Sequence, residues 1–170
     1  MDIAALIRNV PDFPKPGILF KDITPLLANG EALAWVVDRM AERYRGRIDA
    51  VVGIESRGFL LGAPVAYALG VGLCIVRKPG KLPHDRHTVT YDLEYGSDSL
   101  EIHKDALPHH GRVAVLDDLL ATGGTARAAV ELVQAAGGSV VECGFLIELA
   151  FLGGKARLAP TPTFALLHYD

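Results

Sequence analysis

The chain has 170 residues, half of them hydrophobic and 22% of them charged, which is ordinary for one globular domain that can bury a core. The formal net charge of −3 argues against bulk attraction to nucleic acid or to an anionic membrane, although a local basic pocket is compatible with it. The N-terminus has no basic segment followed by an apolar one, and no apolar run is long enough to span a bilayer. We therefore expect neither a signal peptide nor a transmembrane helix.

The first third of the chain predicts two helices separated by an irregular segment. Asp2 is a plausible N-cap for a short amphipathic helix that continues to Val10. Residues 13–27 contain three prolines and a glycine, so we expect an irregular, partly extended segment there. Residues 31–45 predict a second helix, because apolar side chains fall on one face and Gly46 provides a stop signal.

From residue 50 onward, short apolar runs alternate with helical patterns. We expect strands at residues 50–54, 73–76, 113–116, 140–149 and 164–167, and helices at residues 58–69 and 125–136. This alternation is typical of an α/β domain with a mainly parallel sheet. The long polar connection at residues 79–96 is either functional or disordered, and alternation around Tyr91 predicts a β-ribbon in part of it.

The two cysteines, Cys74 and Cys143, stand in apolar stretches and outside any zinc-type spacing. Free cysteine is among the most often buried residues, so we expect two reduced thiols in the core. A reducing, cytoplasmic setting is consistent with this usage.

The stretch at residues 113–125, VAVLDDLLATGGT, carries the clearest chemistry. A hydrophobic strand that ends at Leu116 is followed by Asp117 and Asp118, at the edge where open parallel sheets bind ligands. A glycine-rich turn then enters a helix, where backbone N–H groups, two hydroxyls and the helix dipole favour a phosphate. No lysine follows the glycines, so the turn is not a Walker A loop. Carboxylates can bind the hydroxyls of a sugar and the turn can bind a phosphate, so the stretch as a whole suits a ribose 5-phosphate.

This stretch resembles the phosphoribosyl diphosphate (PRPP) signature of the type I phosphoribosyltransferases. The resemblance implies their fold, in which a mainly parallel twisted sheet is flanked by helices and carries a small N-terminal hood and a flexible loop. It implies that Asp117 and Asp118 hold the ribose hydroxyls. By the same resemblance, the 5-phosphate is held by Ala121, Thr122, Gly123, Gly124 and Thr125.

Residues 13–27, FPKPGILFKDITPLL, resemble the hood of the adenine branch of that family almost residue for residue. The resemblance implies that Leu19, Phe20 and Lys21 line the base. An aromatic and an aliphatic side chain on irregular backbone suit a flat heterocycle. Backbone N–H and C=O groups could form hydrogen bonds with the edge of that heterocycle. The alternative for Phe20 is an ordinary core side chain.

Residues 54–59, IESRGF, resemble the loop by which the family holds the leaving pyrophosphate. Glu55, Ser56 and Arg57 are its counterparts here, and a cis peptide between Glu55 and Ser56 is expected from the resemblance. A guanidinium binds phosphate oxygens as a fork, which makes Arg57 a natural clamp; its alternative is a surface arginine.

Two stretches, RKPGKLP at residues 77–83 and YDLEYG at residues 91–96, resemble the ends of the family's flexible loop. The resemblance implies that Arg77, Lys78 and Lys81 help to hold pyrophosphate, partly across a dimer interface. It also implies that Glu94 handles the proton of the base, although such a glutamate taken alone is more often a solvated charge.

Other positions refine the base specificity and limit metal binding. The family's hypoxanthine and guanine enzymes have an aspartate where this chain has Ala121, so that branch is disfavoured. His84 and His87 lack a third ligand and are better explained as solvated than as a metal pair. His109 and His110 are expected in a turn.

The resemblance covers nearly the whole chain and implies transfer of a phosphoribosyl group from PRPP to adenine, which yields AMP and pyrophosphate. Arg57 and Glu94 would be catalytic, and Mg²⁺ would bind mainly through PRPP. A cytoplasmic homodimer with no nucleic-acid or membrane partner is implied, formed by a single domain with a hood at about residues 1–28 and a flexible loop at about residues 79–96. Three alternatives stay open: another base, a PRPP-sensing regulator and a generic nucleotide-binding domain.

Overall fold

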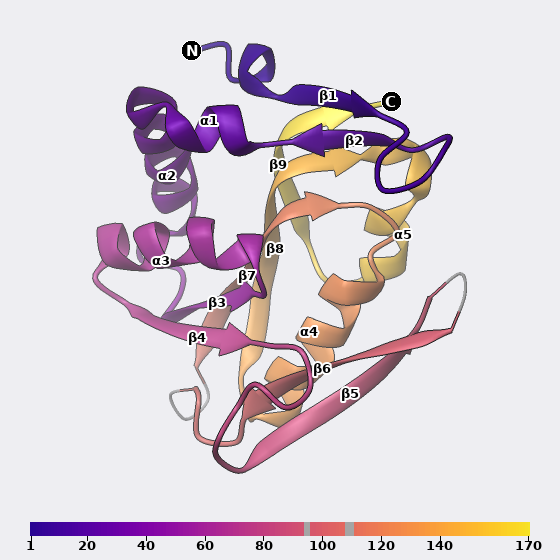
Figure 1. The fold of residues 1–170 in the computed structure, drawn as a ribbon. Coiled ribbons are helices and arrows are strands. Elements are labelled where there is room, and N and C mark those ends of the chain that lie inside the picture. Colours follow the sequence, from indigo (N-terminus) through magenta and orange to yellow (C-terminus); the bar gives the residue numbers. More distant parts are fainter. Residues whose placement is uncertain (94–95, 108–110) are drawn as a thin grey trace.

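The centre of the molecule is a parallel five-stranded sheet, as expected from the alternating pattern (Figure 1). The structure is a computed structural model that describes residues 1–93, 96–107 and 111–170. Its strands follow the order β4 (Gly72–Val76), β3 (Ala50–Ile54), β7 (Arg112–Leu120), β8 (Ser139–Leu149) and β9 (Thr163–Tyr169). All five predicted strands are present. Because they are parallel, their carboxyl ends meet at one edge of the sheet.

Helices cover both faces of this sheet, which explains why its strands are continuous apolar runs. On one face lie α2 (Gly30–Tyr44) and α3 (Arg57–Leu69), and on the other lies α4 (Gly124–Ala135) (Figure 1). Each face therefore has its own cluster of buried side chains. The three predicted long helices are confirmed to within about one residue at each end.

The α2 helix shows how local signals set these bounds. The Asn29 side chain caps the helix by accepting a hydrogen bond from the Ala32 backbone N–H at 3.0 Å. Val36, Met40 and Tyr44 are fully buried on the face of α2 that packs against the core, as the 3.6-residue spacing predicts.

Two antiparallel hairpins stand at either side of the sheet's carboxyl edge. One pairs β1 (Arg8–Pro11) with β2 (Leu19–Asp22), and the other pairs β5 (Arg86–Asp92) with β6 (Ser97–His103). The second hairpin, which packs against α4, confirms a β-ribbon within residues 79–96. The remaining short elements are η1 (Ala4–Leu6), α1 (Thr24–Ala28), η2 (Ala150–Leu152) and α5 (Gly154–Leu158).

Two sequence-based expectations are wrong in detail. The N-terminal helix is only the single turn η1, because residues 8–11 form a ladder with β2 while Ile3 and Ile7 are buried without a helix. Strand β7 does not end at Leu116. Its pairing with β3 ends there, but its pairing with the longer β8 continues to Leu120, so both aspartates lie within the strand.

The structure also bears on the expectations for the cysteines and for a transmembrane helix. Cys74 and Cys143 are free and buried, as predicted. Among the described residues, no helix is long and apolar enough to cross a membrane.

Candidate active site

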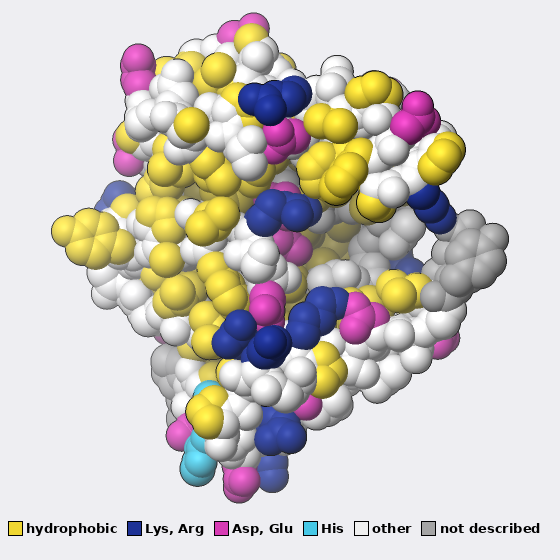
Figure 2. Space-filling view, in the orientation of Figure 1, with side chains coloured by type: hydrophobic (Ala, Val, Ile, Leu, Met, Phe, Trp, Pro, Cys, Tyr) yellow, Lys and Arg dark blue, Asp and Glu magenta, His cyan; other side chains and the backbone are white. Residues whose placement is uncertain are grey.

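A cavity of about 270 Å³ lies at the carboxyl edge of the sheet. The chain segments that line it are residues 55–57, Lys78 and residues 117–126, which follow or end strands β3, β4 and β7. Figure 2 shows this side of the molecule hollowed between the two hairpins, with basic and acidic side chains gathered around the hollow. The cavity is therefore built where parallel sheets bind ligands.

The glycine-rich turn forms one wall of the cavity. Gly123 has a φ of 82°, and a Cβ atom there would lie 2.8 Å from the Gly154 carbonyl oxygen, so the position requires glycine. The helix α4 begins at the next residue, Gly124. Its free N–H groups and positive dipole end face the cavity beside Thr122 and Thr125, an arrangement that can bind a phosphate.

Two adjacent carboxylates form the floor. Burial, and then the neighbouring charge of Asp118, raise the pKa of Asp117 well above its usual value. The Asp117 carboxylate also accepts a hydrogen bond from the Asp118 backbone N–H at 2.9 Å. Asp118 is only 4% exposed and accepts a hydrogen bond from Nε of Arg57. Such oxygen atoms can accept hydrogen bonds from vicinal hydroxyls.

The loop after β3 carries a carboxylate, Glu55, that binds the basic segment at residues 77–78. The peptide between Glu55 and Ser56 is cis, as expected from the sequence. The Glu55 carboxylate accepts hydrogen bonds from Nε and Nη2 of Arg77, both at 3.1 Å, and from the Lys78 backbone N–H at 2.9 Å. The hydrogen bonds from Arg77 are the main reason that the pKa of Glu55 lies below its usual value. Glu55 thus fixes the start of the basic segment against the cavity wall.

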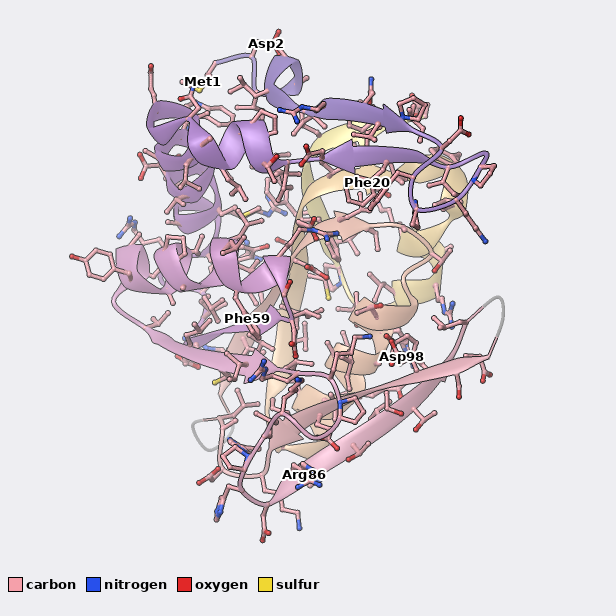
Figure 3. The ribbon with its side chains drawn as sticks, in the orientation of Figure 1. Met1, Asp2, Phe20, Phe59, Arg86 and Asp98 are labelled. Carbon is pink, nitrogen blue, oxygen red and sulfur yellow. The ribbon has the colours of Figure 1, made fainter. Side chains whose placement is uncertain are left out.

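Phe20 is the hood residue that approaches this site. Its ring centroid lies 5.7 Å from Cζ of Arg57, and the ring packs edge-on against Phe13 with centroids 5.1 Å apart. Figure 3 labels Phe20 on the hood. The Lys21 side chain is used elsewhere: its Nζ donates to Asn9 Oδ1 at 2.7 Å and lies over the Tyr169 ring. Any contact of Lys21 with a ligand in the cavity is thereby left to its backbone.

Comparisons with known proteins agree with this geometry. The model of the phosphoribosyl transferase domain family matches residues 20–158. The adenine phosphoribosyltransferase of Chloroflexus aurantiacus is 59% identical over 169 residues, which cover 99% of this chain and 98% of that protein. The chain belongs to the adenine phosphoribosyltransferases.

Solved structures of this family have the same fold. The adenine phosphoribosyltransferase of Thermoanaerobacter pseudethanolicus matches with a TM-score of 0.96 and 49% identity, over 99% of this chain and 98% of that one. The enzyme from Saccharomyces cerevisiae, complexed with an imino-altritol bisphosphate and adenine, matches with a TM-score of 0.92 and 43% identity, over 98% of this chain and 97% of that one.

This phosphoribosyltransferase brings most of the sequence-predicted site residues into one cavity. Those that line it are Glu55, Ser56, Arg57, Lys78, Asp117, Asp118, Ala121, Thr122, Gly123, Gly124 and Thr125. Arg77 is joined to it through Glu55, whereas Lys81 and the hood residues 19–21 do not line it. Glu94 lies outside the described residues.

Sequence analysis missed several polar side chains around the phosphoribosyltransferase site. Asp98 accepts hydrogen bonds from Lys78 and Tyr91, although nothing in its surroundings in the sequence marks it. Arg157, from α5, lies against Gly124 and lines a second cavity of about 690 Å³ beside the glycine-rich turn. The available signal for Arg157 in the sequence was its position three residues after the glycine pair at residues 153–154.

Proposed function

We propose that this phosphoribosyltransferase transfers the 5-phosphoribosyl group of PRPP to N9 of adenine and releases AMP and pyrophosphate, as a step of purine salvage. The observation that carries the proposal is the single cavity in which the carboxylate pair, the glycine-rich turn and the basic residues Arg57 and Lys78 meet. Adenine as the acceptor is supported by full-length relatives that bear this name.

The donor fits the cavity through three groups. Its 5-phosphate binds residues 121–125 at the start of α4, and its ribose hydroxyls bind Asp117 and Asp118. Its diphosphate binds the opposite wall, formed by the loop at residues 55–57 and Lys78, with Arg77 and Lys81 nearby. Each charged end of the donor thereby faces a group of opposite charge or a helix N-terminus.

The base binds between the hood and the end of β7. The Phe20 ring lies 5.7 Å from Cζ of Arg57, a cavity-lining residue, and Leu119 belongs to the cavity lining itself. These two side chains provide apolar contacts for a flat heterocycle. The backbone of Leu19 and Lys21 reads its polar edge, which is consistent with the engagement of the Lys21 ammonium elsewhere.

Mg²⁺ is the proposed cofactor, and the donor atoms around the cavity fit it. Asp117 and Asp118 offer the oxygen ligands that Mg²⁺ prefers. The described residues contain no group of three His, Cys, Asp or Glu side chains that could hold a metal on its own, so most ligands would be oxygens of PRPP and water. When bound, Mg²⁺ would neutralise charge on the diphosphate.

The chain's own residues stabilise the leaving group and manage the proton. Displacement by N9 at C1 of the ribose inverts that carbon and leaves negative charge on pyrophosphate, which Arg57 and Lys78 stabilise. Glu94 accepts the proton that the base loses. Closure of residues 79–96 over bound PRPP excludes the water that would otherwise hydrolyse the donor.

The protein is further proposed to be a single-domain cytoplasmic homodimer, with a hood at about residues 1–28. An exposed apolar patch on α3 and β4 supports an interface between two copies: Leu60, Tyr67 and Leu73 are 50%, 90% and 38% exposed. Hydrophobic side chains gather over this part of the molecule in Figure 2. Sedimentation analysis should show a dimer, and Tyr67→Asp should shift it toward monomer.

One experiment tests the activity and its rivals. The protein is mixed with PRPP and Mg²⁺, each of adenine, hypoxanthine, guanine, xanthine and orotate is offered singly, and pyrophosphate release is measured. We expect release with adenine and its loss on addition of EDTA, with recovery when Mg²⁺ is restored. Turnover of another base would overturn the specificity, and PRPP binding without turnover would favour a PRPP-sensing regulator.

A further inference from the structure

The end of the β5–β6 hairpin carries a carboxylate that the proposed reaction does not use. Asp98 stands near the start of β6, directly opposite Tyr91 of β5, so both side chains lie on the same face of the hairpin. Figure 3 shows Asp98 between the hairpin and α4. The hairpin packs on α4, which brings Asp98 to the side of the donor cavity.

Both oxygens of Asp98 are engaged. Oδ2 accepts hydrogen bonds from Nζ of Lys78 and, at 3.3 Å, from the Tyr91 hydroxyl. Oδ1 accepts the Ser99 backbone N–H at 2.8 Å, which fixes the plane of the carboxylate. Asp98 therefore holds one cavity-lining cation in a set direction.

The same carboxylate reaches the opposite cavity wall through Tyr91. The Tyr91 hydroxyl lies 3.3 Å from Oγ1 of Thr125, in the first turn of α4. An ionised carboxylate has no proton to give, so Tyr91 donates to Asp98 and can accept from Thr125. The Asp98 carboxylate and the Tyr91 phenol thus join Lys78 to Thr125. In the proposed function, Lys78 binds the diphosphate and Thr125 binds the 5-phosphate.

A lysine on a flexible four-carbon stem loses entropy when it is fixed at a ligand, and an ammonium has three N–H donors. Asp98 occupies one of these donors and leaves two for oxygens in the cavity. The Lys78 side chain is 43% exposed and that of Asp98 is 30% exposed, so as a mere surface ion pair they would contribute little to stability. The contribution of this pair is therefore expected in ligand binding more than in folding.

We propose that Asp98 is a positioning residue for the donor: it pre-orients Lys78 toward the diphosphate and, through Tyr91, aligns Thr125 with the 5-phosphate. This inference rests on the proposed function, because that function places PRPP against Lys78 and Thr125. It adds a determinant of donor affinity that contacts no substrate itself.

The test is steady-state kinetics of Asp98→Asn and Tyr91→Phe with PRPP, Mg²⁺ and adenine. Asp98→Asn should raise the KM for PRPP about tenfold or more, the lower end of the range expected for a hydrogen bond to a charged group, and raise the inhibition constant of pyrophosphate by a similar factor. The KM for adenine and kcat should change less than twofold. Tyr91→Phe should raise the KM for PRPP by about two- to threefold, because it removes a neutral donor.

The double variant and a matched control complete the test. If both residues act through one network, the combined effect should be smaller than the product of the single effects. Asp105→Asn, which removes an exposed carboxylate just beyond β6, should leave all constants unchanged. Unchanged KM for PRPP in Asp98→Asn, or equal losses for PRPP and adenine together with a lower Tm, would overturn the inference. A wild-type protein that turns over no base would instead overturn the proposed function and the inference with it.

Discussion

Arg57 and Asp118 form an ion pair that joins the loop after β3 to the end of β7, with Nε of the guanidinium donating to Oδ2 of the carboxylate. Asp118 is almost fully buried, whereas the Arg57 side chain is 44% exposed. The pair uses Nε, and within the part of the chain that the structure describes the Nη groups have no hydrogen-bond partner. They are therefore available to oxygens of a diphosphate.

Arg57→Lys tests the fork geometry of this guanidinium. A lysine keeps the charge but cannot bind Asp118 and a phosphate group with one rigid plane, so kcat/KM for PRPP should fall about 100-fold, as when a group that stabilises transition-state charge is removed. Pyrophosphate release under limiting PRPP measures it. Arg127→Lys, which alters an exposed pair with Glu131 on α4, serves as the control and should retain wild-type activity. Wild-type kinetics in Arg57→Lys would remove Arg57 from the diphosphate site.

Asp117→Asn should stabilise the protein while impairing donor binding. The pKa of Asp117 is raised in the folded state, chiefly by burial, so the folded protein binds this proton more tightly than the unfolded chain does. The stabilisation by this proton is complete below the unfolded pKa and is lost as pH rises through the folded one. Asparagine does not titrate, so the variant should have the higher Tm at neutral pH, with the difference disappearing toward pH 3.

Asp49→Asn is the control of opposite sign. Hydrogen bonds from the Arg112 side chain and backbone lower the pKa of Asp49 to about 2. Asp49 thus contributes stability above its unfolded pKa, and this is lost as pH falls toward about 2. Its asparagine variant should be less stable than wild type at neutral pH. Thermal melts of both variants between pH 3 and pH 8 that show the same sign would contradict this account.

The sequence predicted the sheet, the long helices and most residues that line the cavity, because each depends on contiguous residues. Runs such as residues 50–54 are apolar throughout only when helices cover both faces of a strand, and the turn at residues 121–125 holds its chemistry in five consecutive positions. The contact of Lys78 with Asp98 was not predictable in this way. It joins residues 20 positions apart and depends on the tertiary packing of the β5–β6 hairpin, which pairs with the chain just after β4 through Arg77 and Glu101 and packs on α4.

The two errors have a related cause. Whether residues 8–11 form a helix or a strand depends on β2 as a partner, and whether β7 ends at Leu116 depends on the length of β8. The spacing of apolar residues along the sequence does not show which strand pairs with residues 8–11 or how long β8 is. The orientation of Lys21 toward Tyr169 likewise depends on where the end of the chain lies, so the family motif could not indicate the direction of this side chain.

Phe20→Ala tests the placement of the base. The Phe20 ring centroid lies 5.7 Å from Cζ of Arg57, which lines the cavity, and removal of the ring should raise the KM for adenine about tenfold or more, given the area that an aromatic side chain buries against a ligand. The KM for PRPP should change much less. Phe20→Tyr keeps the ring and should retain an adenine KM within about threefold of wild type. An unchanged adenine KM in Phe20→Ala would mean that Phe20 is only a packing residue for Phe13.

Glu94→Gln tests the proton role proposed for a residue outside the described part of the chain. Glutamine keeps the size of the side chain but cannot accept the proton of the base, so single-turnover rates should fall about 100-fold or more. Both KM values should stay within a few-fold of wild type. Glu131→Gln, on the exposed side of α4, is the matched control. A wild-type single-turnover rate in Glu94→Gln would assign the proton to another acceptor.

Gly58→Ala tests how closely α3 must approach β7 for the site to form. A Cβ atom at Gly58 would lie 2.6 Å from the Leu116 carbonyl oxygen and 3.1 Å from Oδ1 of Asp117, so the backbone of one element must move. Overpacking of this kind costs about 1–3 kcal/mol, and here the displaced atoms belong to the carboxylate floor. We therefore expect a lower Tm and, in the protein that remains folded, a kcat/KM for PRPP reduced by about tenfold or more. Gly30→Ala, at the start of α2 where nothing lies within 4 Å of the added atom, should leave both unchanged. If Gly58→Ala loses stability but keeps its kcat/KM for PRPP, the approach of α3 serves folding alone and the carboxylates do not depend on it.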